Sequence, residues 1–214
     1  MIQINRFIFN PFQENTYVLF DETNECVIVD AGCYTSEEQA ELEEFISSNK
    51  LIPKLAINTH GHIDHILGNK FVKDKWGVEL LGNPEDIPLL QSAVNQALMF
   101  GLSVDDVPNF DKFINNGDTI SFGKSELKVI GTPGHSRGGI CLYSPEANFL
   151  LAGDTLFKAS IGRTDLPGGN YNQLIQSINE NLLTLPESVV VYSGHGDPST
   201  LGWEKNNNPF LTKQ

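Results

Sequence analysis

The sequence is poor in cysteine and has no long apolar run. Its three cysteines, Cys26, Cys33 and Cys141, are an odd number without a Cys-x-x-Cys spacing, which argues against a disulfide framework and suits a reducing compartment. No stretch reaches the roughly 18 consecutive apolar residues that cross a bilayer. The first 15 residues also lack the basic segment and apolar run of a signal peptide. We therefore expect a cytoplasmic protein without a membrane partner.

Positive charge is scarce as well. The chain has 14 Lys and Arg against 27 Asp and Glu, which gives a formal net charge of −13, and it has three arginines and no basic cluster. A protein that neutralises phosphate backbones needs the opposite balance, so nucleic acid is not an expected partner. With 214 residues, of which 40% are hydrophobic, the chain can form a sizeable core.

The distribution of Gly and Pro gives no linker or change of composition, so we expect one domain over residues 1–214. Short apolar or alternating runs predict strands at residues 2–9, 16–20, 26–30, 54–58, 78–81, 118–122, 126–131, 139–144, 147–153 and 188–193. Helical spacing predicts helices at residues 36–49, 65–76, 84–100 and 171–183, the first opened by a Ser36-x-x-Gln39 capping box. This pattern favours two sheets packed face to face with helices outside, with the strand order left open.

The five histidines all lie in short polar turns where strand-like runs end. They are His60, His62 and His65 in Thr-His-Gly-His-Ile-Asp-His, His135 in Thr-Pro-Gly-His, and His195 in Ser-Gly-His-Gly. Loops at strand ends gather on a common rim, where residues distant in sequence can converge. A single histidine in a turn is usually solvated or a core residue, but the dense H-x-H-x-D-H run favours a metal site.

The spacing inside that run suits two neighbouring cations. In an extended turn His60 and His62 point the same way. Asp64 and His65 follow at the start of a helix and face a neighbouring point. Imidazole and carboxylate suit Zn²⁺ or iron. Asp154, at the end of the apolar run 149–154, is well placed to be shared between the two sites.

At these residues the sequence resembles the metallo-β-lactamase superfamily of metallohydrolases, over nearly the entire chain. The resemblance implies an α/β (α+β, four-layer) fold, the αββα sandwich, with metals at the edge of its two sheets. It also implies a first metal held by His60, His62 and His135, a second held by Asp64, His65 and His195, and Asp154 as a bridge. The Val-Asp-Ala-Gly segment resembles the family's first motif and implies that Asp30 orients the ligands. The alternative is a turn Asp at a strand end.

The segments Gly153–Phe157 and Ser160–Asp165 resemble the glyoxalase II branch, the hydroxyacylglutathione hydrolases, and in particular its compact bacterial members. Full-length members carry a further C-terminal helical domain that holds glutathione, whereas 19 residues follow His195 here. Arg163 matches a basic position near the carboxylate of the thiol substrate, where a guanidinium could clamp an anion. A solvated or loop-bracing Arg is the alternative.

The resemblance implies hydrolysis of a 2-hydroxyacyl thioester by a metal-bound hydroxide that Asp64 and Asp154 orient. It implies two divalent ions, zinc first, with iron and manganese open. The alternative is a mononuclear iron persulfide dioxygenase that uses His60, His135 and Asp154. Such enzymes tend to have Cys where Ile161 stands, which favours hydrolysis. The expected partner is a small thioester, and its acyl group, its thiol carrier and the oligomeric state stay open.

Overall fold

The computed structural model describes residues 1–104 and 106–212. Within these residues the strands form two six-stranded sheets and a two-stranded hairpin. The first sheet has the order β1 (Gln3–Phe9), β2 (Glu14–Phe20), β3 (Glu25–Val29), β4 (Ile52–Ile57), β5 (Glu79–Gly82), β6 (Lys112–Phe113). The second has the order β14 (Ser199–Thr200), β13 (Val190–Ser193), β10 (Phe149–Gly153), β9 (Ile140–Ser144), β8 (Ser125–Gly131), β7 (Thr119–Phe122). The hairpin pairs β11 (Leu156–Phe157) with β12 (Ser160–Ile161).

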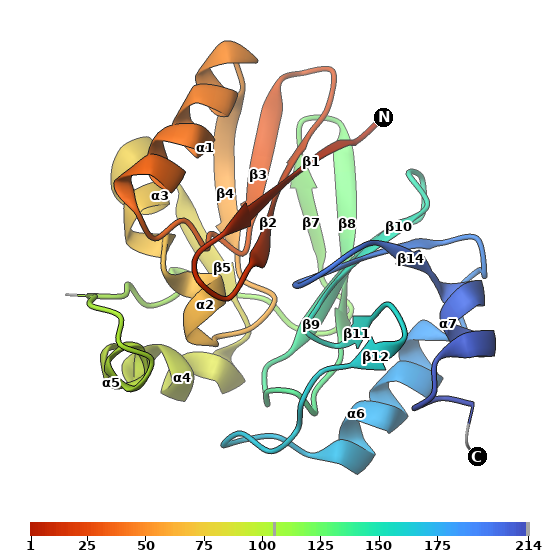
Figure 1. Ribbon diagram of the computed structural model, residues 1–214. Helices are drawn as coiled ribbons and strands as arrows, with labels where there is room; N and C mark the ends of the chain where they lie inside the picture. The colour runs from red at the N-terminus through yellow and green to blue at the C-terminus, as the bar shows by residue number, and fades with distance from the viewer. Residues whose placement is uncertain (105, 213–214) are drawn as a thin grey trace.

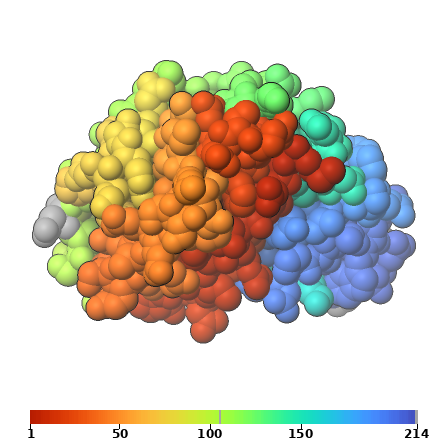
Figure 2. Space-filling model, turned by 90° about the horizontal axis from the view of Figure 1, so that it is seen from above, coloured from red at the N-terminus to blue at the C-terminus, as the bar shows by residue number. Residues whose placement is uncertain are grey.

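Helices cover the outer faces of both sheets. They are α1 (Ser36–Ser48), α2 (Ile63–Ile66), α3 (Asn69–Trp76), η1 (Pro84–Asp86), α4 (Ile87–Gln91), α5 (Ala93–Met99), α6 (Tyr171–Ser177), η2 (Ile178–Leu182) and α7 (Leu201–Asn207). Figure 1 shows α1 and α3 on the outside of the first sheet, and α6 and α7 beside the second. The predicted αββα sandwich, formed as a single domain, is confirmed. Each half of the chain builds one sheet, and the two halves lie side by side (Figure 2).

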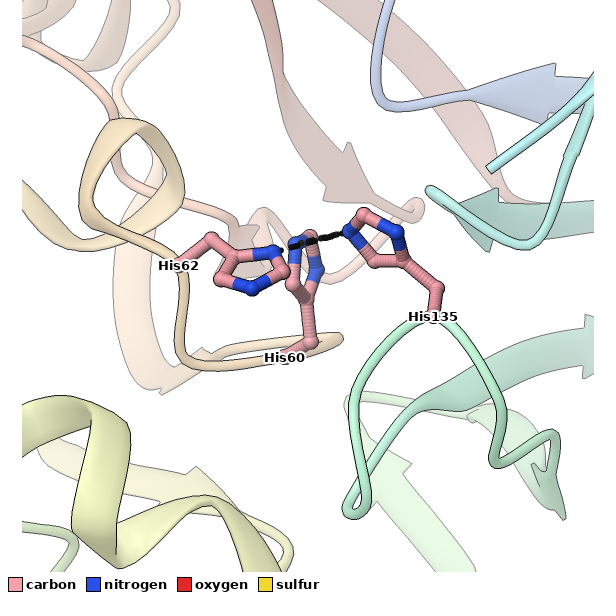
Figure 3. A group of neighbouring side chains, drawn as sticks. All are labelled: His60, His62 and His135. Atoms are coloured by element: carbon pink, nitrogen blue, oxygen red, sulfur yellow. Dashed lines mark hydrogen bonds between the residues drawn. The ribbon is translucent and has the colours of Figure 1, made fainter. Parts of the chain in front are cut away.

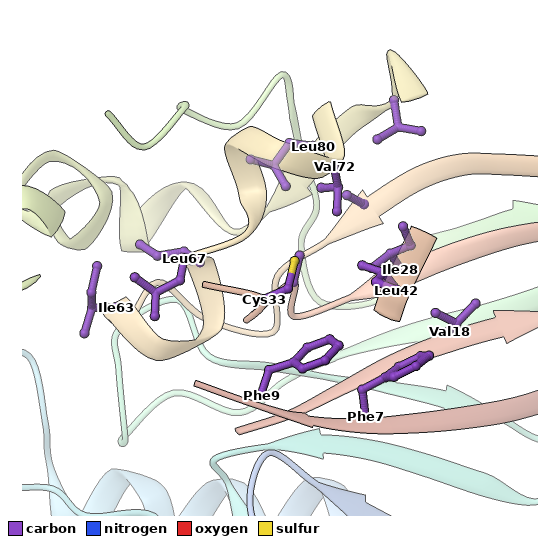
Figure 4. Packing of buried hydrophobic residues seen from close by; sticks show 14 of the residues in the cluster. Phe7, Phe9, Val18, Ile28, Cys33, Leu42, Ile63, Leu67, Val72 and Leu80 are labelled. Carbon is purple, nitrogen blue, oxygen red and sulfur yellow. The ribbon is translucent and has the colours of Figure 1, made fainter. Parts of the chain in front are cut away.

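Alternate side chains of the central strands fill different layers. In β2, Val18 packs toward the helices of the first half, whereas its neighbour Leu19 packs between the two sheets. In β10, Leu151 belongs to the layer between the sheets and Leu150 to the layer under α6 and η2. Successive side chains of a strand point to opposite faces. A strand buried on both faces therefore has a continuous apolar sequence, as β10 does. Figure 4 shows the layer on the helix side of the first sheet, where Phe9, Val18 and Ile28 pack with Leu42 of α1.

Two predicted helices, 65–76 and 84–100, are interrupted in the structure, and the predicted helix 36–49 has a different capping box. The capping box is Thr35-x-x-Glu38, one residue before the predicted one: the Thr35 hydroxyl accepts from the Glu38 N–H and the Glu38 carboxylate accepts from the Thr35 N–H. The predicted helix 65–76 divides at Gly68, whose N–H donates to the Ala31 carbonyl at 2.6 Å. The predicted helix 84–100 divides into η1, α4 and α5, with a break at Ser92. The break at Gly68 coincides with a contact to Ala31, 37 residues earlier, which helical periodicity does not report.

Several short elements had no counterpart in the sequence prediction. These are β6, the β11–β12 hairpin, β14 and α7. The strands among them have two residues each, which is too short for a period-2 pattern. Among the described residues, none of the helices has the length and apolar character that crossing a membrane requires.

Candidate metal centre

Seven histidine and aspartate side chains converge at one edge of the sandwich. They come from the loop after β4 (His60, His62), from α2 (Asp64, His65) and from the loops after β8 (His135), β10 (Asp154) and β13 (His195). Each of these loops leaves the carboxyl end of a strand. The chain thus brings together at one rim every histidine and aspartate that the sequence singled out as a metal ligand.

One group of ligand atoms is formed by His60, His62 and His135, each of which contributes a ring nitrogen, all within 4.8 Å of one another. His62 Nδ1 lies 2.8 Å from His135 Nε2, and His135 Nε2 lies 3.3 Å from His60 Nε2. Figure 3 shows the three rings pointing toward a common point. Burial lowers the pKa of His60, and it lowers the pKa of His62 to about 4. These rings are therefore neutral near pH 7, as metal ligands must be.

A second group is formed by Asp64, His65 and His195, also within 4.8 Å of one another. The Asp64 Oδ2 atom lies 3.1 Å from His195 Nε2 and 3.6 Å from His65 Nε2. Burial lowers the pKa of His65, but the carboxylates of Asp64, Asp154 and Asp30 outweigh burial and raise it well above its ordinary value. In the metal-free protein His65 is therefore an imidazolium held by carboxylates.

Asp154 lies between the two groups. Its Oδ1 atom is 3.4 Å from His65 Nε2, and its Oδ2 atom is 3.6 Å from His135 Nε2 and 3.7 Å from His195 Nε2. Gly194 permits this packing, because a Cβ there would lie 2.6 Å from His65 Cε1 and would collide with Asp154 Oδ1. A carboxylate that faces both groups can serve as a ligand to both.

Three histidines are anchored through the ring nitrogen that faces away from the centre. His135 Nδ1 donates to the Arg163 carbonyl at 2.7 Å, and His195 Nδ1 donates to the Phe12 carbonyl at 3.1 Å. His60 Nδ1 lies 3.1 Å from the Thr59 hydroxyl. Because a carbonyl can only accept, the proton of His135 and of His195 is assigned to Nδ1. When these rings are neutral, their Nε2 lone pairs therefore point to the centre, which is the arrangement that ligand histidines require.

The buried polar atoms at the centre fit a bound cation. Among the described residues, His65 Nε2 and Asp154 Oδ1 are buried without a hydrogen-bond partner. Leaving such atoms unsatisfied costs about 1–3 kcal/mol each, and native proteins rarely tolerate it. Nitrogen and carboxylate oxygen are also the donor set of zinc and of non-haem iron. The side chains present therefore fit divalent metal ions at both groups.

Asp30 and Glu14 lie behind His65. Asp30 accepts from the Thr59 N–H at 2.7 Å and the Thr59 hydroxyl at 2.6 Å, and its Oδ2 atom lies 3.1 Å from His65 Nδ1. The fully buried Glu14 has Oε1 3.9 Å from the same nitrogen, and burial raises the pKa of Glu14 well above its ordinary value. Sequence reasoning did not find Glu14, because a glutamate at the start of a strand carries no signal of its distant contacts.

Asp86 ties the two histidine loops together and was also missed. Its Oδ2 atom accepts from the Gly61 N–H at 2.9 Å and from the Ser136 hydroxyl at 2.8 Å. Its Oδ1 atom accepts from the Gly138 N–H at 2.7 Å. Burial raises the pKa of Asp86 against the opposing effect of these three hydrogen bonds. One carboxylate thus fixes the loop between His60 and His62 relative to the loop of His135.

We expect Asp86→Ala to destabilise the protein by about 2–4 kcal/mol, because buried donors on both loops lose their acceptor. The metal affinity of the variant should also fall, since the two histidine loops are no longer fixed relative to each other. Urea unfolding of the metal-free protein measures the first effect and metal titration the second. Glu85→Ala, an exposed side chain in the same turn, is the control. Equal stability of the two variants would contradict this role of Asp86.

A cavity of about 560 Å³ opens directly onto the ligand groups. Its walls include the apolar side chains of Phe12, Ile63, Phe100, Phe157, Ile161 and Leu166, and the charged side chains of Lys158, Arg163 and Asp197. The Arg163 guanidinium donates to both carboxylate oxygens of Asp165 at 2.8 Å. Phe100 directly follows α5, so the predicted helical segment 84–100 contributes to the cavity wall.

Comparison with known proteins now identifies the family. The model of the metallo-β-lactamase superfamily matches residues 9–195. The chain belongs to this superfamily. A relative from Bacillus subtilis (strain 168) named probable metallo-hydrolase YqgX is 36% identical over 208 residues, covering 96% of each chain. The Haemophilus influenzae (strain ATCC 51907 / DSM 11121 / KW20 / Rd) protein named hydroxyacylglutathione hydrolase GloC is 35% identical over 210 residues, covering 95% of each.

Solved structures of the superfamily agree with this fold. BLEG-1, described as a B3 metallo-β-lactamase, has a TM-score of 0.90 and 33% identity, covering 98% of this chain and all of that one. TTHA1623, solved in a di-iron-bound form, has a TM-score of 0.87 and 33% identity, covering 97% of this chain and all of that one. Membership of the superfamily, together with the His/Asp groups at the rim, supports a metal-dependent hydrolase.

Proposed function

We propose that this protein is a binuclear metal-dependent thioesterase that hydrolyses 2-hydroxyacyl thioesters in the cytoplasm. The observation that carries the proposal is a pair of ligand groups joined by Asp154 at the floor of a 560 Å³ cavity. The thioester bond as substrate is supported by 35% identity, over 95% of both chains, to the relative named hydroxyacylglutathione hydrolase.

The proposed ligands are His60, His62 and His135 for the first metal and Asp64, His65 and His195 for the second, with Asp154 between them. Zinc is the metal we propose first. Iron and manganese accept the same donor atoms, and the neighbouring structure of TTHA1623 is a di-iron-bound form. Asp30 would orient His65 through the ring nitrogen opposite the metal, a role that sets the direction and basicity of a ligand.

Bound divalent metals supply a nucleophilic hydroxide near neutral pH and stabilise negative charge on the carbonyl oxygen and the leaving thiolate. The side chains do the positioning. Asp64 keeps 14% of its surface exposed, so its carboxylate can orient the nucleophile and accept a proton. The apolar walls from Phe12, Phe157 and Ile161 hold the thioester and exclude bulk water, which strengthens the electrostatic interactions at the floor. Arg163 stays a predicted contact to an anionic substrate group.

The proposal is tested by measuring metal content and thioester turnover on the same protein sample. Protein purified without added metal is analysed for metal per chain and assayed by thiol release from a lactoyl thioester of glutathione. Two metals per chain with thiol release support the thioesterase. One iron per chain with oxygen uptake on glutathione persulfide, and no thiol release, would replace it with the dioxygenase. Hydrolysis of a chromogenic cephalosporin alone would instead favour a β-lactamase, the class to which BLEG-1 is assigned.

A further inference from the structure

The charged side chains of the cavity wall differ in whether they already have partners. Arg163 is held by both oxygens of Asp165 at 2.8 Å. Asp197 lies 4.0 Å from an Arg6 nitrogen. Lys158 lines the same cavity and is exposed, and its ammonium forms no ion pair with any residue that the structure describes. Lys158 is therefore a cation of this wall whose ammonium has no ion-pair partner among the described residues.

The backbone that carries Lys158 is fixed by the C-terminal helix α7. Lys158 and Ala159 form the turn of the β11–β12 hairpin, with Ala159 at φ +60°. The Ala159 N–H donates to Glu204 Oε2 at 3.0 Å, and Asn208 Nδ2 donates to the Ser160 carbonyl at 2.9 Å.

Two side chains hold this turn: Glu204 on α7 and Asn208 at the end of α7. Both are completely buried, and Asn208 Nδ2 donates to Glu204 Oε2 at 2.8 Å. A hairpin of two-residue strands is marginal alone. The buried Glu204–Asn208 pair therefore holds the turn in place, and the side chain of Lys158 starts from a fixed position on the cavity wall.

We propose that Lys158 recognises a carboxylate on the thiol carrier of the substrate, an inference that rests on the proposed thioesterase function. The scissile carbonyl must reach the ligand groups at the floor, whose histidines are mostly buried. The exposed Lys158 therefore meets the part of the substrate that extends outward, which is the carrier. An unpaired ammonium on the wall of this cavity, in a chain of net charge −13, favours an anion. The substrate class is a thioester of a carboxylate-bearing thiol.

Matched substrates test this inference. Lactoyl thioesters of glutathione, which has carboxylates, and of N-acetylcysteamine, which has none, share one acyl group. We expect Lys158→Gln to raise KM for the glutathione thioester by up to about fivefold, the upper range for an exposed ion pair, with kcat within about twofold. KM for the N-acetylcysteamine thioester should not change. Lys158→Arg should retain tight binding, and Lys128→Gln, at an exposed position on β8, is the control.

A binding measurement separates this inference from the proposed function. S-hexylglutathione, a thioether that cannot be hydrolysed, is titrated into metal-free protein by calorimetry. If the thioether binds the Lys158→Gln variant more weakly than wild type, by about the factor seen in KM, the inference is supported. This holds even if no thioester is hydrolysed, because failure of hydrolysis contradicts only the proposed thioesterase function. Equal KM and equal affinity in wild type and Lys158→Gln would overturn the role of Lys158, as would a wild type that does not bind the thioether.

Discussion

Replacing Asp64 by Ala is expected to lower kcat for thioester hydrolysis by about 10³-fold, within the range of roughly 10²–10⁴ for loss of a positioned acid–base group. Asp64 Oδ2 lies 3.1 Å from His195 Nε2 and faces the cavity. The variant loses both a proposed metal ligand and the group that orients the nucleophile. Initial rates of thiol release at saturating metal measure the effect.

The fold should survive this substitution, because the Asp64 backbone is held independently of its side chain. Asn10 Nδ2 donates to the Asp64 carbonyl at 2.9 Å, and Asn10 also donates to the Gly32 carbonyl at 3.0 Å. Circular dichroism and urea unfolding of the metal-free variant check the fold. Asp197→Ala removes another carboxylate of the same cavity, one that is 75% exposed, and should keep nearly full activity. A kcat of Asp64→Ala equal to that of wild type would rule out the assigned role.

The convergence of the histidines could be predicted because it depends on local rules. Polar residues at the ends of several strands meet at one rim of a sheet, and the H-x-H-x-D-H run places four of them there by spacing alone. The layers of the sandwich also follow from apolar runs. In β2 and β10 adjacent residues such as Leu150 and Leu151 fill different layers, so the continuous run itself indicates a strand buried on both faces.

The acids that hold the site in place could not be predicted in the same way. The acceptor contacts of Asp86 reach Gly61 and Gly138, 25 and 52 residues away. Glu204 Oε2 accepts a hydrogen bond from the Ala159 N–H, which lies 45 residues earlier in the chain. Such partners are set by packing of whole elements, whereas periodicity reports only which face of one element is apolar.

Metal binding is expected to release about one to two protons at pH 7. Burial lowers the pKa of His65, but Asp64, Asp154 and Asp30 raise it well above its ordinary value, so the metal-free ring is protonated. Burial lowers the pKa of His195 as well, but its hydrogen bond to Asp64 and the charges of Asp154 and Asp64 together raise it above its ordinary value. A metal must displace these protons. Affinity should therefore rise with pH, by about tenfold per unit for each proton displaced, up to the pKa of His65. Calorimetry in buffers of different ionisation enthalpy counts the protons.

The same equilibrium predicts a large change in stability on chelation. A ligand that binds only the folded chain at about 1,000 times its Kd adds about 4 kcal/mol, so a chelator should lower the free energy of unfolding by that amount. Asp30→Asn keeps the proposed ligands but removes a carboxylate 3.1 Å from His65 Nδ1. It should lower the pKa of His65 and reduce the proton release at pH 7. A free energy of unfolding that is unchanged by the chelator would show that the folded chain holds no stabilising metal. Metal binding without proton release in wild type would contradict the electrostatic account, since His65 could not then be both an imidazolium in the free protein and a neutral ligand in the loaded one.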